Sequence, residues 1–223
     1  MEYNITESKI SDKKIHELSV EEMIFVHLNT SYSPIIVKNA LLRSTLSFVY
    51  QNIQHSLANE YSKHLMPYIS LCSILDQLGT CYNRIDKAQP RFGNGIKRCL
   101  YYFGEFDEND DIIRILYSLR NGLLHNVSLS SYDKFNNKYY HFRYNKDIEG
   151  IYKDPELEWD GSYETLDGNR EKYTTSINVE RFRDMVFDCI QKAADLNQNS
   201  KLELRLFDGA RQLFFDYVRS TSR

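Results

Sequence analysis

Apolar residues recur at helical spacing over about ninety residues that begin at Pro34. Residues 37–57 carry one stripe of this kind, in which the repeating positions are apolar or threonine: Leu41, Leu42, Thr45, Phe48, Val49, Ile53 and Leu57. A second helix is expected from Pro67 to about residue 85, because proline fits the first turn of a helix. Gly79 lies inside this segment although glycine is a poor helix former, which indicates a close contact between two helices.

Two further helices are expected before the middle of the chain. A short one is predicted around residues 95–103. Another follows the carboxylate-rich segment 107–111, whose negative charge suits the positive end of a helix dipole, and ends near Asn126. The pattern therefore predicts a series of helices within residues 34–130.

The periodicity changes after Ser131. Residues 138–144 are aromatic and β-prone, and residues 171–177 resemble a second strand, with an acidic, turn-rich stretch between them. Asn178 is a suitable N-cap for a helix that follows, and residues 201–218 are expected to form a last helix. We therefore predict a small β-hairpin or three-stranded insert, followed by C-terminal helices.

These elements predict a mainly α fold, in which a helical bundle carries a small β insert. Four regions are expected along the chain. Residues 1–33 form an N-terminal extension with a short helix, and residues 34–130 form the bundle. Residues 131–177 form the β-rich insert, and residues 178–223 form C-terminal helices that pack on the bundle.

Composition and charge restrict the function classes. The 28 lysines and arginines nearly balance the 31 aspartates and glutamates, so only a local patch would attract a nucleic acid. The four cysteines form no ligand spacing and are expected to be buried thiols, and no metal or cofactor is predicted. The polar N-terminus does not resemble a signal peptide, and no run of about 18 apolar residues occurs. A cytoplasmic protein without a membrane partner is expected.

The most informative motif is Arg120-Asn121, followed by His125, at the end of an amphipathic helix. Arginine offers a planar, permanently charged fork that matches phosphate oxygens, and imidazole is the side chain that ordinarily exchanges protons near neutral pH. Asn121 and His125 are four residues apart and therefore share one helix face. The alternative is that these polar residues only cap the last carbonyl groups of their helix.

The arrangement of Arg120, Asn121 and His125 resembles the Arg-Asn-x-x-x-His motif of the HEPN superfamily, and the resemblance covers about residues 38–130. Such domains are short antiparallel helical bundles, often metal-independent ribonucleases that act as symmetric dimers in toxin–antitoxin, phage-defence or RNA-processing systems. The resemblance implies that these three residues are catalytic. It also implies that an acid on an earlier helix supports them, for which Asp76 is the candidate through pairing with Arg120. Asp76 is otherwise an ordinary solvent-facing acid.

Cleavage of RNA by its own 2′-hydroxyl requires a base, an acid and positive charge at the phosphate. Arg120 and His125 lie about 140° apart around an ideal helix, so one straight helix presents them poorly to a single atom. Two-fold pairing with a second copy would place both sets across one cleft and supply a second histidine. We therefore expect a homodimer, with RNA as substrate and an antitoxin or regulatory protein as a further partner.

The aromatic strand is a second candidate for RNA contact. Alternation places Lys138 and Tyr140 on one face and Arg143 on the other, and these three residues are the predicted RNA-binding set. The simpler interpretation is a solvated strand that packs on the bundle. For the whole chain, the alternative to an endoribonuclease is a non-catalytic HEPN-like module that binds a nucleotide or a partner protein.

Overall fold

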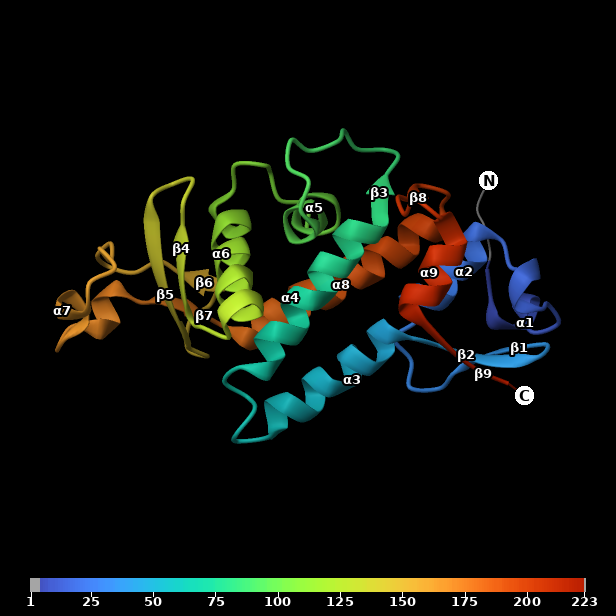
Figure 1. The fold of residues 1–223 in the computed structure, drawn as a ribbon, viewed down its shortest axis with the longest axis horizontal. Helices are drawn as coiled ribbons and strands as arrows, with labels where there is room; N and C mark the ends of the chain where they lie inside the picture. Colours follow the sequence, from blue (N-terminus) through green and yellow to red (C-terminus); the bar gives the residue numbers. More distant parts are fainter. Residues whose placement is uncertain (1–4, 223) are drawn as a thin grey trace.

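The computed structural model describes residues 5–222 and shows a mixed α/β fold (Figure 1). Within these residues 49% of the chain is helical and 17% is in strands. The α-helices of this part are α1 (Glu7–Ile10), α2 (Val20–Leu28), α3 (Thr45–Ala58), α4 (Met66–Cys81), α5 (Gly95–Tyr102), α6 (Asp111–Asn126), α7 (Tyr163–Leu166), α8 (Val179–Gln198) and α9 (Gly209–Tyr217). Its strands are β1 (Ile35–Val37), β2 (Ala40–Ser44), β3 (Tyr82–Arg84), β4 (Ser130–Asp133), β5 (Lys138–Tyr144), β6 (Tyr152–Lys153), β7 (Thr175–Ile177), β8 (Leu202–Leu204) and β9 (Val218–Ser222).

The prediction of a mainly α bundle was wrong, because the strands form three sheets outside and beside the helices. Two of these sheets join segments that are far apart in the sequence. Leu41 in β2 pairs with Thr221 in β9, and Tyr82 in β3 pairs with Leu204 in β8. Local periodicity carries no information about such distant pairing partners, so the strands at both ends of the chain were read as helix or loop.

Three predicted helices are shorter than expected for this reason. The segment at residues 37–44, predicted as the first turns of a helix, forms most of the β1–β2 hairpin, and α3 begins at Thr45 behind its N-cap Ser44. The segment at residues 201–218, predicted as one helix, divides into β8 and α9. The helix predicted to reach about residue 85 ends as α4 at Cys81, because residues 82–84 form β3. Helices α2, α5, α6 and α8 agree with their predicted positions.

Helices α4 and α5 cross at a close backbone approach. A Cβ atom on Gly79 in α4 would lie 1.9 Å from the carbonyl oxygen of Gly95 at the start of α5, so only glycine permits this approach. The contact predicted from Gly79 is therefore confirmed. It brings the first turn of α5 against α4, and α6 packs against both helices. The four cysteines are buried, as predicted.

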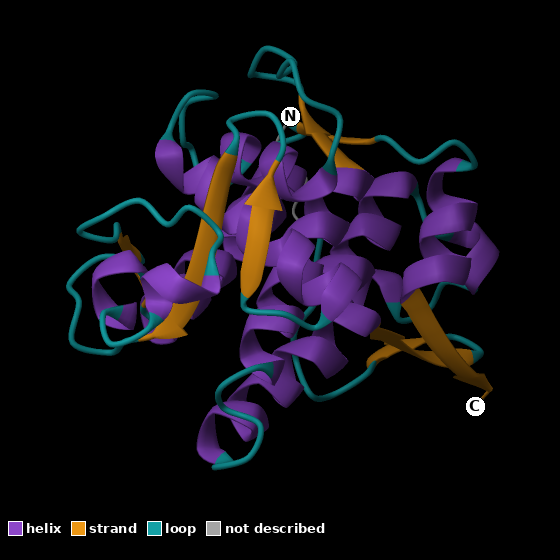
Figure 2. Cartoon of the chain, turned by 60° about the vertical axis from the view of Figure 1, so that its left-hand side comes forward, coloured by secondary structure: helices purple, strands orange, loops and turns teal. Residues whose placement is uncertain are grey.

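The insert is a four-stranded sheet with the order β4-β5-β7-β6, in which β5 and β7 are parallel. The predicted strand at residues 138–144 is confirmed as β5, whereas the one at residues 171–177 is reduced to β7 after a turn of 3-10 helix. Tyr140 and Phe142 of β5 are buried and attach the sheet to the helical body. Figure 2 shows the long strands of this insert lying against the helices.

No helix within residues 5–222 is long and apolar enough to cross a membrane.

Candidate functional site

The end of α6 fixes the position of the Arg-Asn…His motif. The helix closes at Val127, which adopts the left-handed conformation, and the Ser128 N–H donates to the Gly122 carbonyl oxygen at 3.0 Å. A Cβ on Gly122 would lie 2.6 Å from the Ser128 carbonyl oxygen, so the chain turns back tightly against its own helix. Strand β4 consequently runs beside the last turns of α6.

Asp76 holds Arg120 in place. Its Oδ2 atom accepts a hydrogen bond from Arg120 Nε at 2.6 Å, and its Oδ1 atom accepts one from the Ile96 backbone N–H at 2.9 Å. One carboxylate on α4 therefore joins the first turn of α5 to the motif helix α6. The predicted pairing of Asp76 with Arg120 is confirmed. The alternative of an ordinary solvent-facing acid was wrong, since the Asp76 side chain is only 21% exposed.

Arg120 in turn contacts the other two residues of the motif. Its Nη1 atom lies 3.2 Å from Asn121 Oδ1 and 3.0 Å from His125 Nε2. Because a guanidinium group only donates, this bond assigns Nε2 as the acceptor and places the imidazole hydrogen on Nδ1. Although the two residues lie about 140° apart around an ideal helix, the long arginine side chain spans this angle and reaches the imidazole.

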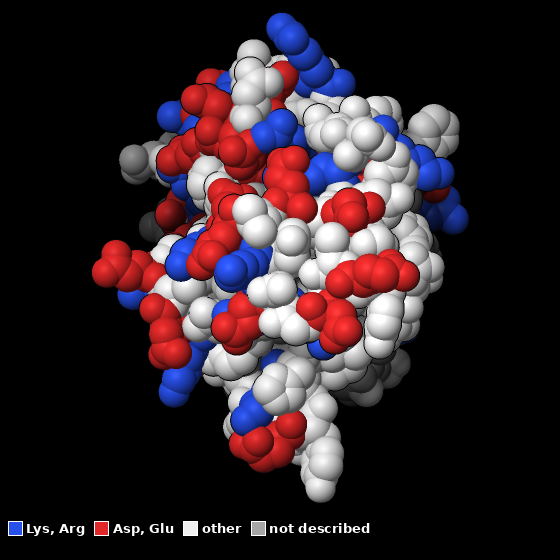
Figure 3. Space-filling view, turned by 90° about the vertical axis from the view of Figure 1, so that its left-hand side faces the viewer, with Lys and Arg blue, Asp and Glu red and all other residues white. Residues whose placement is uncertain are grey.

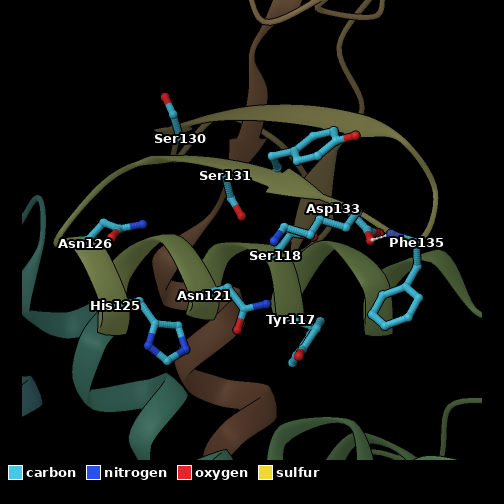
Figure 4. A pocket seen from close by; sticks show the side chains of 11 residues that line it. Tyr117, Ser118, Asn121, His125, Asn126, Ser130, Ser131, Asp133 and Phe135 are labelled. Carbon is cyan, nitrogen blue, oxygen red and sulfur yellow. Dashed lines mark hydrogen bonds between the residues drawn. The ribbon is translucent and has the colours of Figure 1, made fainter.

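Asn121 and His125 line a cavity of about 530 Å³ between α6 and the β4–β5 hairpin. Its lining residues are Tyr117, Ser118, Asn121, His125, Asn126, Ser130, Ser131, Tyr132, Asp133, Lys134 and Phe135. Figure 4 shows Tyr117, Asn121 and His125 projecting from the same side of α6, with the Phe135 ring on that side as well. His125 is exposed, so a ligand in this cavity can reach its ring.

The structure contradicts part of the predicted RNA-binding set on β5. Tyr140 is 5% exposed and stacks on Phe142 inside the molecule, so it cannot stack on a base. Lys138 lies 3.3 Å from Glu158 and Arg143 lies 2.7 Å from Glu171, and the two basic residues lie on opposite faces of the strand. Tyr140 faces inward because alternation along an amphipathic strand sends one face into the core, and sequence alone did not decide which face.

The surroundings of these strand residues are acidic. Residues 145–174 contain nine aspartates and glutamates but four lysines and arginines. Figure 3 views the molecule from the end that carries the insert, and carboxylates outnumber basic side chains over this face. A phosphate backbone would be repelled there, which leaves the cavity beside His125 as the better candidate for RNA contact.

The sequence alone did not assign Tyr117 and Phe135 to the site. Tyr117 precedes Asn121 by one helical turn, and Lys97 Nζ lies 4.3 Å above its ring. Phe135 is in the turn between β4 and β5, which lies on the Tyr117 side of the cavity, away from the end of α6 (Figure 4). The four-residue spacing from Tyr117 through Asn121 to His125 is visible in the sequence, but the position of Phe135 depends on how the hairpin packs.

A second polar cluster lies deep in the body, away from this cavity. His27 on α2 is fully buried, the Gln77 amide Nε2 donates to its Nε2 atom at 2.8 Å, and its Nδ1 atom bonds the Tyr82 hydroxyl. Desolvation lowers the pKa of His27 from 6.5 to about 3. His27 is therefore a neutral member of a buried hydrogen-bond network.

Comparison with protein-family models, with curated proteins and with solved structures gives no match for this chain. Within residues 5–222 no cluster of three His, Cys, Asp or Glu side chains is placed to hold a metal ion.

Proposed function

We propose that this protein is a HEPN-like, metal-independent endoribonuclease whose site is formed by Arg120, Asn121 and His125. The observation that carries the proposal is the 3.0 Å contact of Arg120 Nη1 with His125 Nε2 at the wall of an open cavity. Asp76 fixes the guanidinium, and the guanidinium fixes the imidazole. A cap would place these side chains on the last carbonyl groups of the helix, whereas the Arg120 side chain bonds Asp76, Asn121 and His125 instead.

The reaction that suits these groups is attack of a 2′-hydroxyl on the neighbouring phosphorus. When a bound phosphate draws Arg120 Nη1 away from His125 Nε2, the freed Nε2 atom removes the hydroxyl proton, the new oxygen–phosphorus bond forms, and the bond from phosphorus to the 5′-oxygen breaks. Arg120 stabilises the negative charge that accumulates on the phosphate oxygens, and Asn121 orients the imidazole or donates to the phosphate. The departing 5′-oxygen takes up a proton, which leaves a 2′,3′-cyclic phosphate and a 5′-hydroxyl.

The proton for the 5′-oxygen calls for a second group. The lining of the cavity contributes a single imidazole, that of His125. If two copies of the chain paired through the exposed ends of their α6 helices across a two-fold axis, the second copy would bring another His125 to the same phosphate. We therefore propose a homodimer. Sedimentation equilibrium at micromolar concentration tests it, and a monomer with full cleavage activity would refute the dimer without refuting the ribonuclease.

RNA cleavage in EDTA is the decisive experiment for the activity. The wild type, His125→Ala and Arg120→Ala are incubated with structured and single-stranded RNA, beside His55→Ala as a matched control, since His55 is exposed on α3. We expect cleavage by the wild type and by His55→Ala, with 2′,3′-cyclic phosphate ends, and loss of cleavage in the other two variants. Equal cleavage by all four proteins, or none by the wild type, would refute the catalytic assignment.

Expression in cells tests the biological setting that the motif suggests. A toxin or defence ribonuclease should arrest growth when it is expressed without its antitoxin or regulatory partner, and His125→Ala should not. A wild type that binds RNA or a partner protein without cleaving RNA would instead identify a non-catalytic binding module.

A further inference from the structure

An aromatic side chain is held over the candidate site without contributing to the core. Phe135 is 91% exposed, yet its ring lines the same cavity as His125. The turn that carries it is fixed by Asp133, whose carboxylate accepts from the Phe135 backbone N–H at 3.0 Å and from Asn136 Nδ2 at 2.6 Å. A phenylalanine in this position buries little surface in the fold, so it is available to an incoming ligand.

A second aromatic ring comes from the motif helix itself. Tyr117, Asn121 and His125 follow one another at four-residue intervals and form one stripe of α6, with about 6 Å of helix axis between successive members. Lys97, which does not line the cavity, lies over one face of the Tyr117 ring at 4.3 Å, so a base can stack only on the other face. The cavity therefore offers an aromatic surface at one end and the proposed catalytic imidazole at the other, with the Asn121 amide between them.

These groups match the parts of one nucleotide. Unpaired bases bind proteins by stacking on aromatic rings, and amide side chains hydrogen-bond their edges. Lys134 and the Arg120–His125 pair supply the donors that a phosphate requires. A cavity of about 530 Å³ lies within the range of ordinary small-ligand sites. A base inside a double helix cannot enter, because its faces are covered by neighbouring bases and its edge by its partner.

We infer that this cavity binds one unpaired nucleotide of the substrate, with its base against Phe135 and Tyr117 and its phosphate beside His125. The substrate class is therefore single-stranded RNA or the loops of folded RNA. This inference rests on the proposed ribonuclease function for its choice of ligand. It goes further in naming Phe135 as a residue that selects unpaired RNA.

The test separates binding from cleavage. A fluorescent single-stranded 2′-O-methyl oligonucleotide of mixed sequence, which has no 2′-hydroxyl to attack, is titrated with the full protein, and the same strand is titrated in a duplex. Phe135→Ala is the test variant, and Phe207→Ala is its matched control. Phe207 is fully exposed in the turn before α9, at the opposite end of the molecule from the β4–β5 hairpin (Figure 1). Thermal melting of both variants checks that folding is intact.

We expect the wild type to bind the single strand more tightly than the duplex. Phe135→Ala should weaken binding of the single strand by about 5- to 150-fold, as removal of a stacking ring does elsewhere, and Phe207→Ala should not. Phe135→Tyr should restore binding because it restores the ring. Equal affinity for strand and duplex, or unchanged affinity in Phe135→Ala, would overturn the inference whether or not RNA is cleaved. Binding that depends on Phe135, in a protein that leaves unmodified RNA intact, would support the nucleotide site and refute the ribonuclease.

Discussion

The wild-type protein should lose stability as the pH falls from neutral to mildly acidic, and replacing His27 with glutamine should make this pH-dependent loss smaller. His27 is fully buried, and its pKa falls from 6.5 to about 3 because burial disfavours the charged ring. Both ring nitrogens are engaged: Nε2 accepts from Gln77, which leaves Nδ1 to donate to the Tyr82 hydroxyl. Protonation of Nε2 would place a hydrogen against the Gln77 amide and a charge inside the core.

The sign and size of the effect follow from linkage. Below pH 6.5 the unfolded chain binds a proton at His27, whereas the folded chain does not until about pH 3. The contribution of neutral His27 to the free energy of unfolding is therefore fully present above pH 6.5 and is lost progressively as the pH falls from 6.5 to about 3. The loss is about 2 kcal/mol between about pH 8 and about pH 5, and it reaches about 5 kcal/mol below the folded-state pKa. At about pH 5 this is a large fraction of the free energy of unfolding of an ordinary domain.

Urea denaturation of the wild type and His27→Gln over this pH range measures the difference. The substitution lowers the free energy of unfolding at neutral pH through imperfect packing. Because this packing loss is the same at every pH, it does not affect how the difference between the two proteins changes with pH. Carboxylates that also titrate in the fold contribute equally to both proteins. We expect the gap between the two proteins to narrow by about 2 kcal/mol at about pH 5. Parallel stability curves, or a His27 ring that titrates with its ordinary pKa in an NMR experiment, would refute the burial argument.

Three further changes test the fold around the site. Val127→Gly should raise the free energy of unfolding by about 1 kcal/mol in urea denaturation, because Val127 is exposed and holds a left-handed conformation (φ 52°) that glycine adopts without strain; a decrease would contradict this account. Gly79→Ala should lower the free energy of unfolding by about 2–3 kcal/mol, and with it the melting temperature, because the added Cβ would strike the Gly95 carbonyl oxygen. An unchanged melting temperature would refute the close crossing. Asp76→Asn should lower the free energy of unfolding by about 1–2 kcal/mol and abolish RNA cleavage. A double-mutant cycle with Arg120→Ala should show a coupling energy of about 1 kcal/mol, and additive losses of stability would contradict the pairing.

The sequence alone predicted the elements whose residues carry a complete local pattern. Helix α6 has an acidic start, an apolar face and a polar motif in its last turn, and it occupies the predicted residues. Helix α8 begins directly after its predicted cap Asn178. Strand β5 alternates over the predicted span. In each case the residues that determine the element lie within a few turns of one another, so the pattern is readable without the fold.

Elements that depend on distant partners could not be predicted in this way. Strands β2 and β9 stabilise each other across the length of the chain, and the three-residue strands β3 and β8 exist only because they pair. The orientation of β5 was also not predictable from the sequence. The predicted alternation of its side chains was correct, but the packing of the sheet decided that the face with Tyr140 points into the core. These features therefore changed the predicted fold class and removed one candidate RNA contact.

The candidate site likewise has a part that the local sequence determines and a part that depends on contacts between distant elements. The sequence determined that Arg120, Asn121 and His125 share the last turns of one helix, because residue spacing on a helix fixes their relative positions. Only the tertiary structure decided that Asp76 on α4 binds Arg120, that Arg120 then reaches His125, and that the β4–β5 hairpin brings Phe135 over the same cavity. The physical reason is that helix geometry is set by local backbone hydrogen bonds, whereas contacts between elements depend on how their buried faces pack together.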